Sequence, residues 1–302
     1  MAAKKSRKTR KTPEQRAAEA QALHDTLTAK VEALTESGEW ARYLDFMQSF
    51  HRYSLANLLL ILAQKPEATR VAGFKQWIEK GRQVRKGERA IKIRGFSTKK
   101  ITEEDEATGE ETERVLRRFP ILSVFDISQT DPIEGVEQVE SPTRLLSGED
   151  HAGIYDAMAA HMSAQGWTVA REEITGRNGY TTVDGSRRIV VRADMEPAMA
   201  AKTMLHEAAH AILHAEQLEA DSADYVEHRG RYECEAESVA YVLAGMAGLD
   251  TTDYSVGYVA SWTGGDVDQV RETAENVLRA VQHLAPALPG IAEEEGTGSQ
   301  AA

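Results

Sequence analysis

Residues 196–216 read EPAMAAKTMLHEAAHAILHAE, and this stretch decides the fold of the C-terminal half. Pro197 suits the first turn of a helix, and the alanines and leucines after it favour helix throughout. His206 and His210 are four residues apart, so they lie one turn apart on one face. Two imidazoles at this spacing can bind one tetrahedral zinc ion, and Glu207 can deprotonate a water that the ion activates. The stretch predicts a zinc peptidase-type site with two histidine ligands and Glu207 as catalytic base.

A catalytic zinc site needs a third protein ligand, and the helical stretch RYECEAESVAYVLAGMAGL further along offers three glutamates. Glu233, Glu235 and Glu237 are two residues apart, so they point in different directions on a helix. Glu235 shares a face with apolar residues that suit a core, and we predict it as the third ligand for that reason. His214 is excluded, because it lies eight residues from His206, about 12 Å along the helix axis.

The charge of the chain is unevenly distributed over its 302 residues, which are enough for two domains. Residues 1–100 contain 22 Lys+Arg and 10 Asp+Glu, whereas residues 101–302 contain 14 and 38. Such a split predicts two units with different partners, of which the basic one suits a polyanion. The single Cys234 excludes an intrachain disulfide. The sequence has no apolar run of about 18 residues and no signal-peptide core, so we expect a cytoplasmic protein with no membrane partner.

Turn residues and composition divide the chain into an α+β protein of two domains. The first is predicted to be an α+β DNA-binding unit, and the second a mainly helical unit with a small sheet. A first helix is expected to start at Thr12-Pro13 and to continue to about Leu34. Further helices are expected at about 40–64, 74–80, 150–165, 196–216, 230–248 and 266–285, and strands near 84, 90–96, 119–127, 167–169, 180–183 and 188–191. The predicted boundaries are a disordered basic arm at 1–14, a DNA-binding domain at 15–130, a linker at 131–149, a metallopeptidase-type domain at 150–290 and a disordered tail at 291–302.

Nucleic-acid binding is predicted for the basic stretch from residue 64 to residue 100, which has 12 Lys+Arg against 3 Asp+Glu. Positive side chains can contact phosphates, and exposed aromatic side chains between them can stack on bases. Phe74 and Trp77 are equally consistent with a small core. The candidate DNA-binding residues are Arg70, Lys75, Arg82, Arg85, Lys86, Arg89, Lys92 and Arg94.

Two segments resemble a known family. Residues 57–95, which include GRQVRKGE, and the later VFDISQT resemble the N-terminal domain of the ArdC antirestriction proteins of plasmids, phages and other mobile elements. The resemblance implies that residues 15–130 bind single-stranded DNA. LHEAAHAILH and ECEAESVAYVL resemble the metallopeptidase-like domain of that family and the ImmA/IrrE zinc peptidases. It implies a zincin-like fold, with Zn²⁺ as cofactor and the glutamate of Glu235-Ala236 as third ligand.

Three functions remain open at this point. The first is a DNA-associated zinc peptidase of the antirestriction type, which would act on a protein substrate or on a restriction enzyme. The second is a non-catalytic protein that coats single-stranded DNA and keeps a structural metal site. The third is a peptidase that cleaves a repressor, as the ImmA/IrrE resemblance implies. Glu207 favours an enzyme, because a structural metal site does not need a general base.

Overall fold

The structure, a computed structural model, describes residues 12–104, 111–136, 152–215, 222–249, 251 and 265–291, and only the backbone of 101–104, 111–114, 152 and 222–228. The helices in these residues are α1 (Pro13–Ala33), α2 (Ser37–Phe50), α3 (Leu55–Gln64), α4 (Phe74–Glu79), α5 (Ala152–Ala164), α6 (Pro197–Leu213), α8 (Ser222–Met246) and α10 (Val267–Leu284). Two short 3-10 helices are η1 (Ile127–Gln129) and η2 (Ala285–Ala287). None of the described helices is long and apolar enough to span a membrane.

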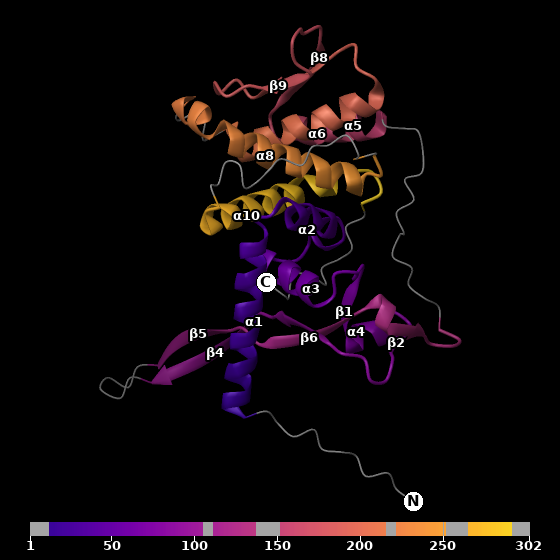
Figure 1. Cartoon of the computed structure of the whole chain (residues 1–302), viewed down its shortest axis with the longest axis vertical. Helices are drawn as coiled ribbons and strands as arrows, with labels where there is room; N and C mark the ends of the chain where they lie inside the picture. Colours follow the sequence, from indigo (N-terminus) through magenta and orange to yellow (C-terminus); the bar gives the residue numbers. More distant parts are fainter. Residues whose placement is uncertain are drawn as a thin grey trace, which may run out of the picture.

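The strands form four small sheets. They are β1 (Val71–Gly73), β2 (Arg82–Val84), β3 (Ile91–Arg94), β4 (Ser97–Glu104), β5 (Glu111–Arg118), β6 (Ile121–Asp126), β7 (Thr130–Pro132), β8 (Thr168–Glu172), β9 (Gly179–Thr181) and β10 (Arg188–Arg192). The sheet orders are β1-β6-β3, β2-β7, β4-β5 and β8-β10-β9. The first three sheets lie in the N-terminal half with α3 and α4, and the fourth lies beside α5 and α6 (Figure 1).

One carboxylate and one helix hold the sheet of β1, β6 and β3 in place. Ile91 and Ile93 of β3 are buried on the side where α3 packs. Asp126 ends β6, and its Oδ1 accepts hydrogen bonds from the backbone N–H groups of Thr69 and Arg70 at 2.9 and 3.0 Å. A buried carboxylate that binds several N–H groups fixes the path of the chain around it. The segment before β1 is thereby fixed to the end of β6.

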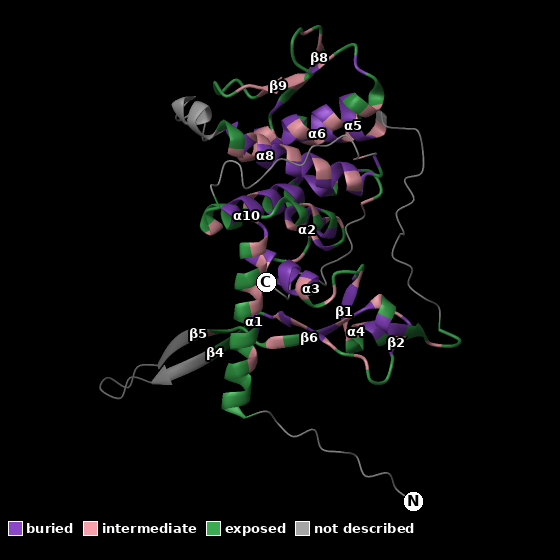
Figure 2. Cartoon of the chain, viewed as in Figure 1, coloured by how far each residue is buried: buried purple, intermediate pink, exposed green. Residues whose placement is uncertain are grey.

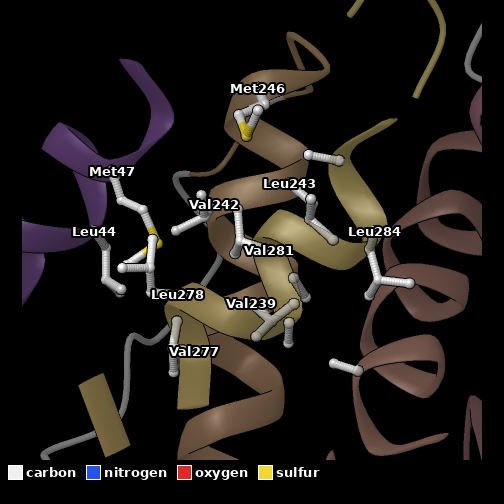
Figure 3. Packing of buried hydrophobic residues seen from close by; sticks show 14 of the residues in the cluster. Leu44, Met47, Val239, Val242, Leu243, Met246, Val277, Leu278, Val281 and Leu284 are labelled. Carbon is white, nitrogen blue, oxygen red and sulfur yellow. The ribbon is translucent and has the colours of Figure 1, made fainter. Parts of the chain in front are cut away.

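Helix α2 belongs to the core of the C-terminal half. Its buried side chains include Leu44 and Met47, which pack with Val239 of α8 and with Val277 and Val281 of α10 in one hydrophobic cluster (Figure 3). Polar bonds join the same helices: the indole Nε1 of Trp40 donates to Ser238 Oγ at 3.2 Å. Figure 2 shows buried residues on α2, α3, α10 and α8, and hydrophobic residues from all four helices belong to one cluster. The two halves of the chain therefore share one core.

The α+β class with two regions is confirmed, and most predicted elements lie within a few residues of their expected positions. The single helix expected at 40–64 is instead α2 and α3, because Ser54 caps a new helix by accepting from the N–H of Asn57. The strands β4 and β5 lie between the strands expected at 90–96 and 119–127, where the sequence predicted no strand. Residues 292–302 of the tail predicted at 291–302, and most of the predicted basic arm and linker, lie outside the described residues. The domain boundaries stay predictions.

Candidate metal centre

Helices α6 and α8 pack side by side and bring three ligand groups to one point. Nε2 of His206 lies 3.0 Å from Nε2 of His210. Oε2 of Glu233 lies 3.6 Å from the first of these nitrogens and 3.8 Å from the second. Among the described residues, His206, His210 and Glu233 are the side chains of metal-binding type that lie close enough together to hold one metal ion.

The triangle of ligand atoms fits a zinc ion. Zinc bonds of about 2.0–2.1 Å in a tetrahedron place any two ligand atoms roughly 3.3 Å apart. The measured separations of 3.0, 3.6 and 3.8 Å bracket that value. Two histidines and one carboxylate with an open fourth position are also a ligand set that catalytic zinc sites use. The residues therefore fit the ion in both distance and chemistry.

The first histidine is oriented by a carboxylate on its far side. Nδ1 of His206 lies 3.2 Å from Oε2 of Glu237, which is one turn beyond Glu233 on α8. With the proton on Nδ1, the ring donates to Glu237 and leaves Nε2 free to bind a cation. Metal-binding histidines commonly have such a partner, which fixes the tautomer and the ring orientation.

The second histidine is oriented through another histidine. Nδ1 of His210 lies 3.1 Å from Nδ1 of His214, whose Nε2 is 2.8 Å from Oε2 of Glu235. The other carboxylate oxygen, Oε1, accepts from Arg231 Nε at 3.1 Å and from Asn276 Nδ2 at 2.9 Å. The row of bonds is satisfied when His210 donates to His214 and His214 donates to Glu235. This again leaves Nε2 of His210 free for a cation.

The structure does not bring Glu235 to Nε2 of His206 and Nε2 of His210, contrary to the expectation from sequence. Glu235 does face the core as predicted and is only 1% exposed, but it lies beside α10 and away from the cleft. Glu233 is 43% exposed because it borders a cleft that opens to solvent. A catalytic site must be open to its substrate, so a half-exposed glutamate suits such a site better than a fully buried one. The shared four-residue spacing of the histidine and glutamate pairs, 206 with 210 and 233 with 237, was the overlooked signal.

The surroundings shift the pKa values of His206 and His210 in opposite directions. Burial lowers the pKa of His206, but its hydrogen bonds to Glu233 and Glu237 outweigh this and raise the pKa to about 10. Burial lowers the pKa of His210 to about 4, helped by the charge on His206. The two histidines in turn hold the pKa of Glu233 well below its usual range. One histidine must therefore lose a proton before both rings can bind a cation.

Glu207 lies beside the ligands and is held by strand β9. The hydroxyl of Thr181 is 2.9 Å from both Oε2 and the backbone oxygen of Glu207. A Cβ atom on Gly179 would lie 2.9 Å from Glu207 Oε1 and 2.9 Å from the backbone oxygen of Val190, so only glycine lets β9 approach α6 this closely. Burial raises the pKa of Glu207 above its usual 4.5. A carboxylate with a raised pKa is suited to accept a proton near neutral pH.

A cleft of about 630 Å³ opens over these groups. Strand β9 forms one wall with Tyr180, and α6 and α8 form the floor. Apolar Met199 and Val183 line it together with the cationic side chains Arg177 and Lys202. The strand β9 lies at the end of its sheet and has one neighbour, β10, among the described strands. The cleft thus combines a wall that can pair with an extended chain and a floor that holds the ligand atoms.

The eight predicted DNA-binding residues do not form one free surface. Arg82 donates to Thr130 Oγ1 at 2.7 Å and so ties β2 to β7. Arg85 pairs with Glu88 and donates to the backbone oxygen of Ser128. Lys92 donates to Ser123 on the neighbouring strand. The side chains of Lys75, Lys86 and Arg89 are exposed, and those of Arg70 and Arg94 are half-buried.

Two family comparisons cover most of the chain. Residues 17–127 match the family described as the N-terminal domain of anti-restriction factor ArdC. Residues 162–255 match the IrrE N-terminal-like domain, a peptidase family. The second match includes all the ligand groups described above.

One relative and two crystal structures match most of the chain at 21–27% identity. The chain is 27% identical to an uncharacterized Bacillus anthracis protein, pXO2-81, over 92% of its own length and 54% of the relative, so it spans about half of that protein. The metal-free crystal structure of the antirestriction ArdC protein from the R388 plasmid is 23% identical with a TM-score of 0.48, over 78% of this chain and 85% of that one. The Mn(II)-bound structure of the same protein is 21% identical with a TM-score of 0.46, over 80% and 86%.

Proposed function

We propose that this ArdC-type protein, which joins an ArdC N-terminal domain to an IrrE-like peptidase domain, is a zinc-dependent peptidase that also binds single-stranded DNA. The observation on which the peptidase depends is the placement of Glu207. Its buried carboxylate is one residue from His206, is fixed by Thr181 and borders the cleft. A purely structural metal site requires neither the cleft nor the carboxylate.

Zinc held by His206, His210 and Glu233 would supply Lewis-acid activation of a water and of the peptide carbonyl. The residues of the chain account for the remaining steps. An extended peptide can pair with the outer edge of β9, which places its backbone along the cleft. Glu207 accepts a proton as the water oxygen bonds to the carbonyl carbon. The same carboxyl group then gives that proton to the leaving amine as the C–N bond breaks.

The DNA-binding part of the proposal is supported by the match of residues 17–127 to the ArdC domain and by the excess of basic residues before residue 100. Phosphate contacts by Lys and Arg give affinity that falls with salt. The acidic C-terminal half disfavours a phosphate backbone, so the nucleic acid is assigned to the N-terminal half.

The peptidase is tested with the full chain and the Glu207→Gln variant. Both are loaded with one equivalent of zinc and incubated with a mixture of unstructured peptides, whose cleavage is followed by mass spectrometry. Wild type should cleave, and the variant should lose roughly 100- to 10,000-fold in rate with its zinc content unchanged. Equal cleavage by the two proteins would exclude Glu207 as the base. Zinc binding without cleavage of any peptide by wild type would favour the non-catalytic alternative.

A further inference from the structure

The hairpin of β4 and β5 projects from the side of the N-terminal half (Figure 1). Its root, residues 95–100 and 115–120, is joined to the main sheet, because Gly95 donates a backbone hydrogen bond to Pro120 at 2.7 Å. This bond continues the pairing of β3 with β6 into that of β4 with β5. The hairpin root is thus a fixed part of the fold.

Two aromatic side chains are exposed at the hairpin root. Phe96 is 39% exposed and Phe119 is 65% exposed, and their ring centroids lie 5.7 Å apart at an angle of 53°. Neither belongs to the two hydrophobic clusters found in the described part of the chain. A pair of large apolar rings that lies outside both clusters and faces solvent favours a ligand with a flat apolar surface.

Register places cations beside these rings. Ser97 pairs with Arg118 and Thr98 with Arg117, and side chains alternate between the two faces of a hairpin. Phe96, Phe119 and Arg117 therefore share one face. Arg118 and Lys99 lie on the other face of the same strands, and all three cations are exposed. The sequence of the hairpin root contains no acidic residue.

We propose that single-stranded DNA crosses the hairpin root, where its bases stack on Phe96 and Phe119, its phosphates contact Arg117 on the same face, and Lys99 and Arg118 on the other face add to the positive potential. The inference rests on the DNA binding proposed above and places it at the hairpin root instead of at the exposed side chains of Lys75, Lys86 and Arg89. Exposed aromatic rings that stack on bases and a cation on the same face that contacts phosphates are the two components of a site for an unpaired strand. In a duplex the bases are already stacked on one another, so the rings have no base face to bind.

The test uses the full chain and a fluorescent oligothymidylate of about 20 nucleotides, with binding measured by anisotropy at several salt concentrations. The double variant Phe96→Ala with Phe119→Ala should weaken binding at least about 30-fold, since each stacked base is worth roughly 1–3 kcal/mol. Binding to a duplex of the same length should change little. Phe74→Ala is the matched control, because Phe74 is 50% exposed on α4 and should leave the affinity unchanged.

The cations are tested separately with a charge-matched pair of triple variants. Changing Lys99, Arg117 and Arg118 to Gln should make the slope of log affinity against log salt shallower by at least about 0.7, the value for the one phosphate that Arg117 neutralises. Changing Lys75, Lys86 and Arg89 to Gln removes the same charge elsewhere and should leave the slope nearly unchanged. Unaltered melting temperatures establish that the variants are folded.

The outcomes separate this inference from the proposed function. If wild type fails to bind the oligonucleotide at low salt, the proposed DNA binding falls, and the inference with it. If wild type binds but the second triple variant loses affinity while the hairpin variants keep it, only the location is overturned. If the phenylalanine variant instead changes the oligomeric state and keeps its DNA affinity, the aromatic pair is a contact between copies of the chain, which also overturns the inference.

Discussion

Nε2 of His214 lies 2.8 Å from Oε2 of Glu235, and both side chains are almost fully buried. His214 also contacts His210, the second proposed zinc ligand. Glu235, His214 and His210 therefore form a continuous row of hydrogen bonds. The three glutamates of α8 thus have separate positions. Glu233 faces both proposed ligand histidines, Glu237 contacts the first of them, and Glu235 reaches the second through His214.

The first prediction separates a ligand from a positioning residue. Glu233→Gln should reduce zinc to well below one ion per chain, because one of three ligands is lost. Glu235→Gln should still bind one ion, with affinity weakened roughly 10- to 100-fold, since an amide cannot accept from His214, Arg231 and Asn276 together. Zinc content after dialysis and competition with a chelating dye measure the two quantities. Retention of zinc by Glu233→Gln and its loss in Glu235→Gln would restore the assignment made from sequence.

The second prediction concerns the contact between β9 and α6. Gly179→Ala should reduce peptide cleavage by at least about 10-fold, because the added methyl group would meet both Glu207 and the backbone of Val190. Zinc content should stay at one ion per chain, since no ligand is touched. Gly176→Ala is a poor control although Gly176 has open space around it, because its φ of +80° would strain an alanine there. Thr175→Ala, at an exposed position one residue earlier, is the better control and should retain full activity.

The third prediction concerns stability and pH in the N-terminal half. Burial raises the pKa of Asp126, but hydrogen bonds from Ser128, Arg70 and Thr69 outweigh it and hold the pKa below the usual 3.8. A depressed pKa gives stability that is present above pH 3.8 and is lost as the pH falls towards the folded-state pKa. Asp126→Asn should therefore be less stable than wild type at pH 7, by about 2–3 kcal/mol.

Urea unfolding at pH 7 and at pH 3 measures this effect. The difference between wild type and Asp126→Asn should shrink at the lower pH. The control is Asp131→Asn, because Asp131 is 62% exposed and its ion pair with Arg85 lies at the surface, so its change should stay below about 1 kcal/mol. A difference for Asp126→Asn that is equal at both pH values would contradict the assignment of an ionised carboxylate.

The fourth prediction concerns the shared core. Trp40 is fully buried, and its replacement by Ala should destabilise the protein by about 3–5 kcal/mol. Trp40→Phe should cost less, since it keeps most of the packing and loses mainly the bond to Ser238. Hydrogen exchange followed by mass spectrometry should show α2, α8 and α10 losing protection together in Trp40→Ala. Exchange that rises in α2 alone would indicate two independently stable halves.

The sequence was most informative where a local spacing determines the chemistry. The alanines and leucines after Pro197 predicted a helix, the four-residue spacing of His206 and His210 predicted a shared face, and both histidine rings meet as expected. Ser54 was also readable in principle, since a serine before an apolar run is a common helix cap. The cap was missed because the apolar spacing continued across it.

The rest depended on contacts between distant parts of the chain. Glu235 was assigned to the metal because it faces the core, but that face packs against α10 and binds Asn276, 41 residues away. Arg82 and Arg85 looked like free cations in a basic stretch, yet their partners come from residues 128–131. Phe119 joins Phe96 only through strand pairing. Such pairings are set by the tertiary fold, which local patterns do not encode.

The burial of α2 against α8 and α10 determines where the molecule can be cut and rejoined. A chimera with a crossover between residues 137 and 151 would take α2 from one parent and its partners from another, so Leu44 and Met47 would meet side chains selected to fit a different helix. Chimeras that keep α2, α8 and α10 from the same parent should fold, even when the sheet with Asp126 comes from elsewhere. In recombination between related genes, functional products should therefore keep these three helices from the same parent. Their crossover points should not coincide with the boundary between the two family matches.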